Sequence, residues 1–92
     1  MIVRISTESQ YRLPDEDAER LNDLDNAAVA AVESGDEDRF HEVFERMLDF
    51  VRREGTPLGE DELEESDVIL PPPDLTFDEA RRDFNGEGLI PD

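Results

Sequence analysis

The sequence contains no cysteine, no tryptophan and no lysine, so that all nine of its cationic side chains are arginines. The absence of cysteine excludes disulfides and thiolate metal sites. The chain also lacks an apolar run long enough to cross a membrane or to form the core of a signal peptide. These absences predict a cytoplasmic protein that does not insert into a membrane. With 92 residues, the chain has room for one small domain.

Acidic residues are abundant instead. Asp and Glu number 27, and the net charge is −18. A Debye length of about 3 Å at 1 M salt would screen the self-repulsion of such a surface, so the composition suggests a protein of a halophilic cytoplasm. An acidic disordered chain and an acidic mimic of nucleic acid are the alternatives, and the periodic apolar residues argue against the first. Direct binding to nucleic acid or anionic lipid is disfavoured, because the arginines are scattered among acids.

A helical hairpin over residues 15–54 is the main structural prediction. Apolar residues recur at helical spacing in two segments, separated by Ser34-Gly35-Asp36. Gly35 can take the left-handed conformation that ends a helix, and Asp36 can cap the next one. The predicted core residues of the two helices are Leu21, Leu24, Phe40, Phe44, Met47 and Val51.

Short elements on either side of this hairpin make the predicted fold class α+β. β-Branched residues predict an N-terminal β-hairpin, and the apolar triplet at 68–70 predicts an edge strand that pairs with it. Thr76 and Glu79 match a capping box at the start of a short helix from Phe77 to Phe84. The predicted parts of the single domain are a β-hairpin at 1–13, the helical hairpin at 15–54, a solvated acidic connector at 55–67, and a C-terminal strand, helix and docked tail at 68–92.

The second helix is apolar over a wider arc than one neighbouring helix can cover. Leu48 and Phe50 lie on opposite shoulders of its apolar stripe. We expect the β-hairpin or the C-terminal helix to cover one shoulder and the other to stay exposed. Because small monomers seldom leave clustered apolar groups open, the exposed shoulder is the predicted partner-binding surface, suited to a partner helix.

No catalytic residue, cofactor site or metal site is predicted. His41 is the only histidine, whereas a zinc site needs two or three further nitrogen or sulfur ligands and a general base needs an oriented partner. The acidic stretch at 60–67 lacks the ligand spacing and turn glycine of a calcium loop. A small enzyme or metal-dependent subunit that uses His41 and neighbouring carboxylates is the alternative. It requires a concave pocket lined by His41 and two carboxylates.

Several short motifs also occur in a characteristic order. They are Met1-Ile2-Val3-Arg4-Ile5-Ser6-Thr7-Glu8, Gln10-Tyr11-Arg12-Leu13, Leu21-Asn22-Asp23-Leu24-Asp25, Gly55-Thr56-Pro57-Leu58, Ser66-Asp67-Val68-Ile69-Leu70-Pro71-Pro72 and Glu87-Gly88-Leu89-Ile90-Pro91. On these motifs the chain resembles the PspA-associated protein family, PspAA, over essentially its whole length, with the acid load of a haloarchaeal member. The resemblance implies a non-enzymatic accessory role in a phage-shock-type membrane-stress response. It also implies binding to phage-shock protein A or a similar coiled-coil partner, and recruitment through that partner to the inner face of the membrane.

Overall fold

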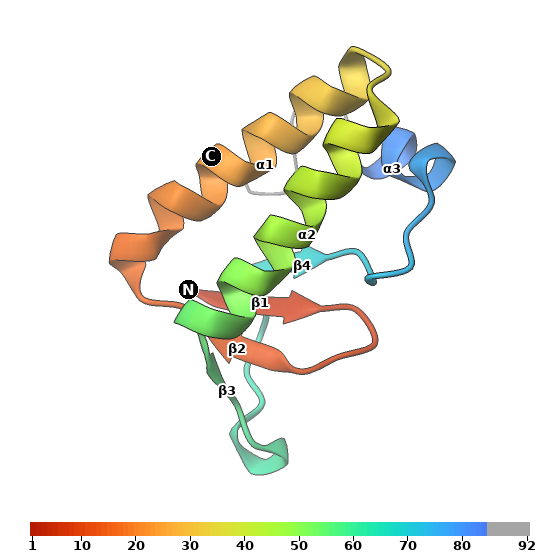
Figure 1. The fold of residues 1–92 in the computed structure, drawn as a ribbon. Helices are drawn as coiled ribbons and strands as arrows, with labels where there is room; N and C mark the ends of the chain where they lie inside the picture. The colour runs from red at the N-terminus through yellow and green to blue at the C-terminus, as the bar shows by residue number, and fades with distance from the viewer. Residues whose placement is uncertain (85–92) are drawn as a thin grey trace.

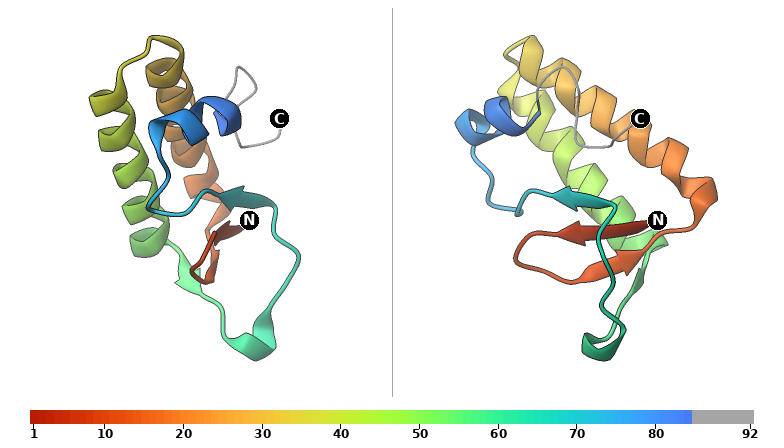
Figure 2. Two further views of the ribbon diagram at one scale, coloured as in Figure 1. Left: turned by 90° about the vertical axis from the view of Figure 1, so that its right-hand side faces the viewer. Right: turned by 180° about the vertical axis from the view of Figure 1, so that it is seen from behind.

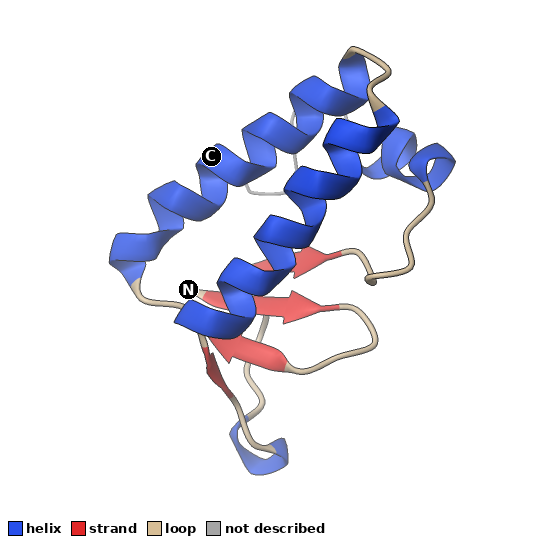
Figure 3. Ribbon diagram, in the orientation of Figure 1, coloured by secondary structure: helices blue, strands red, loops and turns tan. Residues whose placement is uncertain are grey.

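The computed structural model describes residues 1–84, in which two long helices lie against a small sheet (Figure 1). The predicted α+β class is confirmed, with the helices together on one side of the strands (Figure 3). The elements are β1 (Ile2–Ile5), β2 (Gln10–Arg12), α1 (Ala18–Glu33), α2 (Glu37–Glu54), β3 (Thr56–Pro57), β4 (Val68–Leu70) and α3 (Phe77–Asp83), with single 3-10 turns η1 (Asp15–Asp17) and η2 (Glu60–Glu62). The predicted docking of the tail at 88–91 falls outside the described residues.

The sheet has the strand order β3-β2-β1-β4. Strand β1 pairs antiparallel with β2, with Val3 opposite Tyr11, and parallel with β4, with Val3 opposite Val68. The edge strand at 68–70 therefore forms and pairs with the N-terminal hairpin as predicted. Strand β3 forms the opposite edge within the stretch predicted to be a solvated connector. A proline is tolerated there, because an edge strand has one side without a ladder partner.

The ends of the helices follow from local chemistry. Gly35 has φ +73°, and the Asp36 side chain accepts a hydrogen bond from the backbone N–H of Arg39 at 3.0 Å, which starts α2. At the start of α3, the Thr76 hydroxyl accepts from the backbone N–H of Glu79 at 3.2 Å. The Glu79 carboxylate in turn accepts from the backbone N–H of Thr76 at 3.3 Å. This is the capping box that the sequence predicts.

The core lies between the helices and the inner face of the sheet. Alternate residues of β1 and β4 point into it, and α2 contributes the largest side chains. Phe40 stacks on Phe44 with ring centroids 5.5 Å apart, and Phe84, just after α3, meets Phe40 edge-on at 5.2 Å. Of the residues predicted for the core, Leu21, Phe40, Phe44, Met47 and Val51 are buried, and Leu24 is half-buried.

The acidic connector between β3 and β4 crosses part of the outer face of the sheet. Seen from behind, this segment crosses the strands on the side away from the helices (Figure 2). The buried amide of Gln10 holds it: Nε2 donates to the Glu64 carbonyl at 2.5 Å and to the Ser66 hydroxyl at 2.7 Å, and Oε1 accepts from the Glu64 N–H at 3.2 Å. Arg12 forms an ion pair with the Glu64 carboxylate. The connector is therefore attached to the sheet at Glu64 and Ser66, while residues 61–65 are exposed.

Candidate partner-binding groove

Neither predicted shoulder of α2 is left open. Leu48 is 2 % exposed and Phe50 8 % exposed. The expectation that one of them stays exposed is wrong, because α2 packs against α1, α3 and β3, so that both shoulders are covered (Figure 1). A partner could contact either side chain only where the surface next to it is concave.

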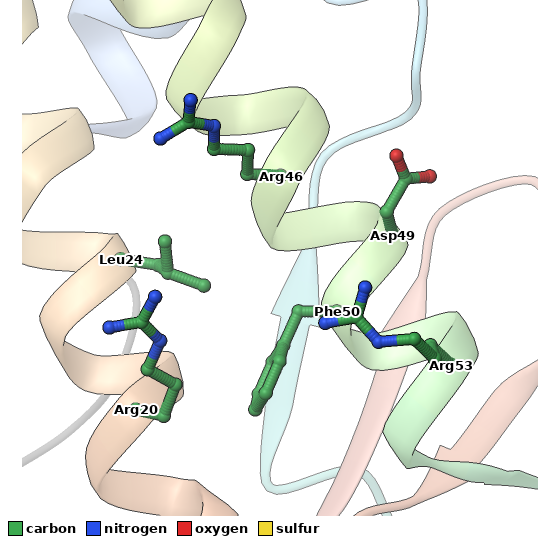
Figure 4. Close-up of a pocket in the computed structure, with 6 residues that line it drawn as sticks. All are labelled: Arg20, Leu24, Arg46, Asp49, Phe50 and Arg53. Atoms are coloured by element: carbon green, nitrogen blue, oxygen red, sulfur yellow. The ribbon is translucent and has the colours of Figure 1, made fainter.

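That surface is hollow beside Phe50. A hollow of about 350 Å³ lies between α1 and α2, and we call it the α1–α2 groove. It is lined by Arg20 and Leu24 of α1 and by Arg46, Asp49, Phe50 and Arg53 of α2. In Figure 4 the Phe50 ring points toward α1, and the guanidinium groups of Arg20 and Arg53 lie beside the apolar side chains. Leu48 does not line it.

The groove follows from the side chains placed between the two helices. Near the connecting loop, α1 presents small residues such as Ala28 and Ala31, which allow α2 to approach closely. At the opposite end α1 carries Leu21 and Leu24, and there the helices diverge (Figure 1). The lining residues occupy one face of each helix, because residues four positions apart lie one turn above each other.

The rim of the groove is cationic on a chain of net charge −18. Arg46 forms an ion pair with Glu42 at 2.9 Å, and Arg53 with Glu54 at 3.2 Å. Arg20 takes part in none of the ion pairs found within residues 1–84. Asp49, the one acid of the lining, is 3.3 Å from Arg52.

A second, smaller hollow lies on the outer face of the sheet. It measures about 220 Å³ and is lined by Arg4, Glu8, Ser9, Gln10, Leu58 and Leu63. Leu63 is 61 % exposed, and Ile69, whose partner in the sheet register is Arg4, is 58 % exposed. Beside it, Arg52 donates two hydrogen bonds to the Glu8 carboxylate at 2.5 and 3.1 Å, and these bonds raise the pKa of the Arg52 guanidinium.

His41 lines neither hollow. Its Nε2 lies 4.0 Å from the Glu37 carboxylate on the same helix, and its ring meets Phe40 edge-on at 5.4 Å. In the part of the chain that the structure covers, no three His, Cys, Asp or Glu side chains are grouped so that they could hold a metal ion. Nor is any helix of that part long and apolar enough to span a membrane.

The sequence interpretation predicted Phe50 as a partner-binding residue but did not include the arginines that line the groove beside it. The signal was present in outline, since Arg46, Phe50 and Arg53 are spaced at four and three positions on one helix. What the spacing does not contain is the matching Arg20 and Leu24 face of α1, because the relative rotation of two helices is set by packing.

Comparison with known proteins gives one result at the level of the family. A search of curated proteins and a search of solved structures each returned no match. The family model PspAA, described as PspA-Associated protein, matches residues 1–92. The chain therefore belongs to the PspAA family of PspA-associated proteins.

Proposed function

We propose that this chain is a non-enzymatic accessory protein of a phage-shock-type membrane-stress response, and that it binds phage-shock protein A or a similar coiled-coil protein. The observation that carries the proposal is the match to the PspA-associated family over residues 1–92. The protein would act in the cytoplasm and reach the inner face of the membrane through this partner.

The α1–α2 groove supports a helical partner. Helix-in-groove recognition places apolar side chains of one helix into a hollow between two others. Leu24 and Phe50 provide the apolar floor for such a side chain. Of the two residues predicted for the contact, Phe50 lines the groove, whereas Leu48 is buried and does not line it.

The acidic composition suggests a protein that works at high salt, and there its affinity for a partner must come from short-range contacts. In molar salt, attraction between charges beyond a few Å is screened, so apolar anchors and direct hydrogen bonds must provide the binding free energy. A groove with an apolar floor is suited to this condition.

The proposal is tested by mixing the purified chain with full-length phage-shock protein A from the same source in molar KCl. Sedimentation velocity should show this chain moving with the larger protein. The control is an unrelated acidic coiled-coil protein of similar length, which should leave it sedimenting alone. Absence of a complex with phage-shock protein A at micromolar concentrations, with both proteins folded, would exclude the proposed partner.

A further inference from the structure

We infer that the α1–α2 groove accepts an acidic helical segment, whose large apolar side chain lies on Leu24 and Phe50 and whose carboxylates bind the arginines of the rim. This inference rests on the proposed function, because it specifies the chemistry of the surface that the partner presents. The inferred contact is not purely apolar, because the partner segment provides both an apolar side chain and acids on either side of it.

Charge is the first argument. Three arginines and one aspartate line the groove, so its sign is opposite to that of a chain carrying a net −18. The aspartate, Asp49, is paired with Arg52 outside the lining. An acidic segment is repelled by most of this protein's surface, and the groove is a place where its carboxylates meet guanidinium groups instead.

The arginines can accept these carboxylates. Arg20 has no ion-pair partner within residues 1–84, so nothing described there competes for it. Arg46 and Arg53 are each held by a glutamate of their own helix, but both pairs are exposed, and exposed ion pairs are weak. A guanidinium also has five N–H donors, so it can bind a second carboxylate while keeping the first.

The chain contains one contact of this kind already. The acidic connector docks on the outer face of the sheet, where Arg12 binds the Glu64 carboxylate and the neighbouring Leu63 lines a hollow. Arg12 thus holds an acidic segment through a carboxylate, while the leucine of that segment, Leu63, stays 61 % exposed. The α1–α2 groove presents arginines to a carboxylate in the same way, and it adds the apolar side chains of Leu24 and Phe50.

The apolar floor distinguishes this occupant from a polyanion. Nucleic acid or free phosphate would use the arginines but would leave Leu24 and Phe50 without a matching surface. A nucleic acid backbone would also approach the many carboxylates beyond the rim. A protein helix carries an apolar side chain and acids one turn apart, which matches the arrangement of floor and rim.

The first experiment measures the affinity for phage-shock protein A in molar KCl. Arg20→Glu should weaken binding at least about tenfold, which corresponds to about 1.4 kcal/mol. Arg20→Lys should have a smaller effect, because an ammonium cannot bind a carboxylate through a planar fork of donors. Arg39→Glu is the matched control, because Arg39 is an exposed arginine of α2 that does not line the groove, and it should change the affinity less than twofold. Circular dichroism checks that each variant is folded.

The second experiment uses two synthetic helical peptides, so that it does not depend on phage-shock protein A. One carries a leucine with a glutamate four positions to either side, and the other has glutamines in their place. Amide NMR signals of Leu24 and Phe50 should shift with the first peptide, and much less with the second or in the Arg20→Glu protein. Potassium phosphate serves as a third probe, and shifts caused by phosphate but not by either peptide would mean a simple anion site.

The failures of the two proposals are distinguishable. If the wild-type chain binds phage-shock protein A and Arg20→Glu binds equally well, the groove is not the contact and the inference is overturned while the proposed function stands. If the wild-type chain does not bind phage-shock protein A, the proposed function fails. The peptides then decide the inference, which is overturned if the glutamate peptide shifts neither amide, or shifts them no more than the glutamine peptide does.

Discussion

The two faces of the sheet are held by different kinds of contact. The inner face presents the apolar residues Val3, Ile5 and Leu70 to a core that α2 completes with its phenylalanines. The outer face is crossed in part by the acidic connector, which is attached through the buried amide of Gln10 and the Arg12–Glu64 ion pair. Burial of apolar area is non-directional and large, whereas hydrogen bonds are directional and contribute little net free energy each. The inner face should therefore determine whether the chain folds, and the outer face where the connector lies.

The largest effect is expected from Phe44→Ala on the inner side. Phe44 is 2 % exposed, and its ring lies 5.5 Å from Phe40 and 5.9 Å from Phe84. Truncating it should cost about 3–5 kcal/mol, a large share of the roughly 5–15 kcal/mol that stabilises a typical domain. Urea unfolding in molar KCl measures the change, with exposed Glu45→Ala as the control. A Phe44→Ala protein as stable as its parent would show that the aromatic cluster does not stabilise the core.

The same contrast explains how much of the fold could be predicted. The inner face depends on local periodicity, so the α2 stripe, the Asp36 cap and the Thr76 capping box follow from nearby residues. The outer face depends on Gln10 meeting Glu64 and Ser66, which are 54 and 56 positions away. No spacing rule encodes that pairing. The two-residue strand β3 is likewise too short to produce an alternating pattern.

The α1–α2 groove could be predicted from the sequence only in part. Phe50 could be singled out because α2 is apolar on too wide an arc for one neighbour. Its burial could not be predicted, because it depends on how α1, α3 and the sheet pack around α2. The arginines of the rim come from two helices whose relative rotation depends on the packing of the whole core, so the sequence singled out Phe50 and not the arginines around it.

Gln10→Ala should have the next largest effect, and it should act on the outer face. It removes three partly buried hydrogen bonds between the Gln10 side chain and the connector, and leaves the Glu64 N–H and carbonyl without that partner. We expect a loss of about 1–3 kcal/mol. Cleavage by a glutamate-specific protease should also become faster within residues 60–65. Ser9→Ala on the neighbouring exposed position is the control. Equal stability combined with unchanged cleavage would mean that other contacts hold the connector.

Salt should affect the connector more than the core. With a net charge of −18, lowering KCl from molar to dilute lengthens the Debye length from about 3 Å to 10 Å or more, and acids that were screened repel one another. We expect the midpoint of thermal unfolding to fall by at least about 4–8 °C, which corresponds to about 1 kcal/mol for a domain of this size. Hydrogen exchange should show the amides of Glu64 and nearby residues losing protection before those of α2. A midpoint independent of salt would remove the interpretation of the acid load as an adaptation to salt.

The smallest effects are expected from two ion pairs, one that holds the connector to β2 and one that joins α2 to the turn between β1 and β2. The Arg12–Glu64 pair is about half exposed on both partners, so Arg12→Ala should cost no more than about 0.5 kcal/mol. The Arg52–Glu8 pair is less exposed and has two hydrogen bonds, so Arg52→Ala should cost somewhat more, up to about 1 kcal/mol. Both values come from urea unfolding of each variant beside its parent.

Substitution, rather than pH, separates an ion pair from simple packing at Arg52. Hydrogen bonding to Glu8 raises the pKa of Arg52 above its ordinary, already strongly basic value. A cation whose pKa is raised on folding adds stability that is fully present below its unfolded pKa and lost only above it. The difference in unfolding free energy between the parent and Arg52→Ala should therefore be the same at neutral and at moderately alkaline pH. An Arg52→Met variant, which keeps part of the packing without the charge, should lose nearly as much as Arg52→Ala. If it is instead as stable as the parent, the Arg52 side chain stabilises the protein through packing and not through its contact with Glu8.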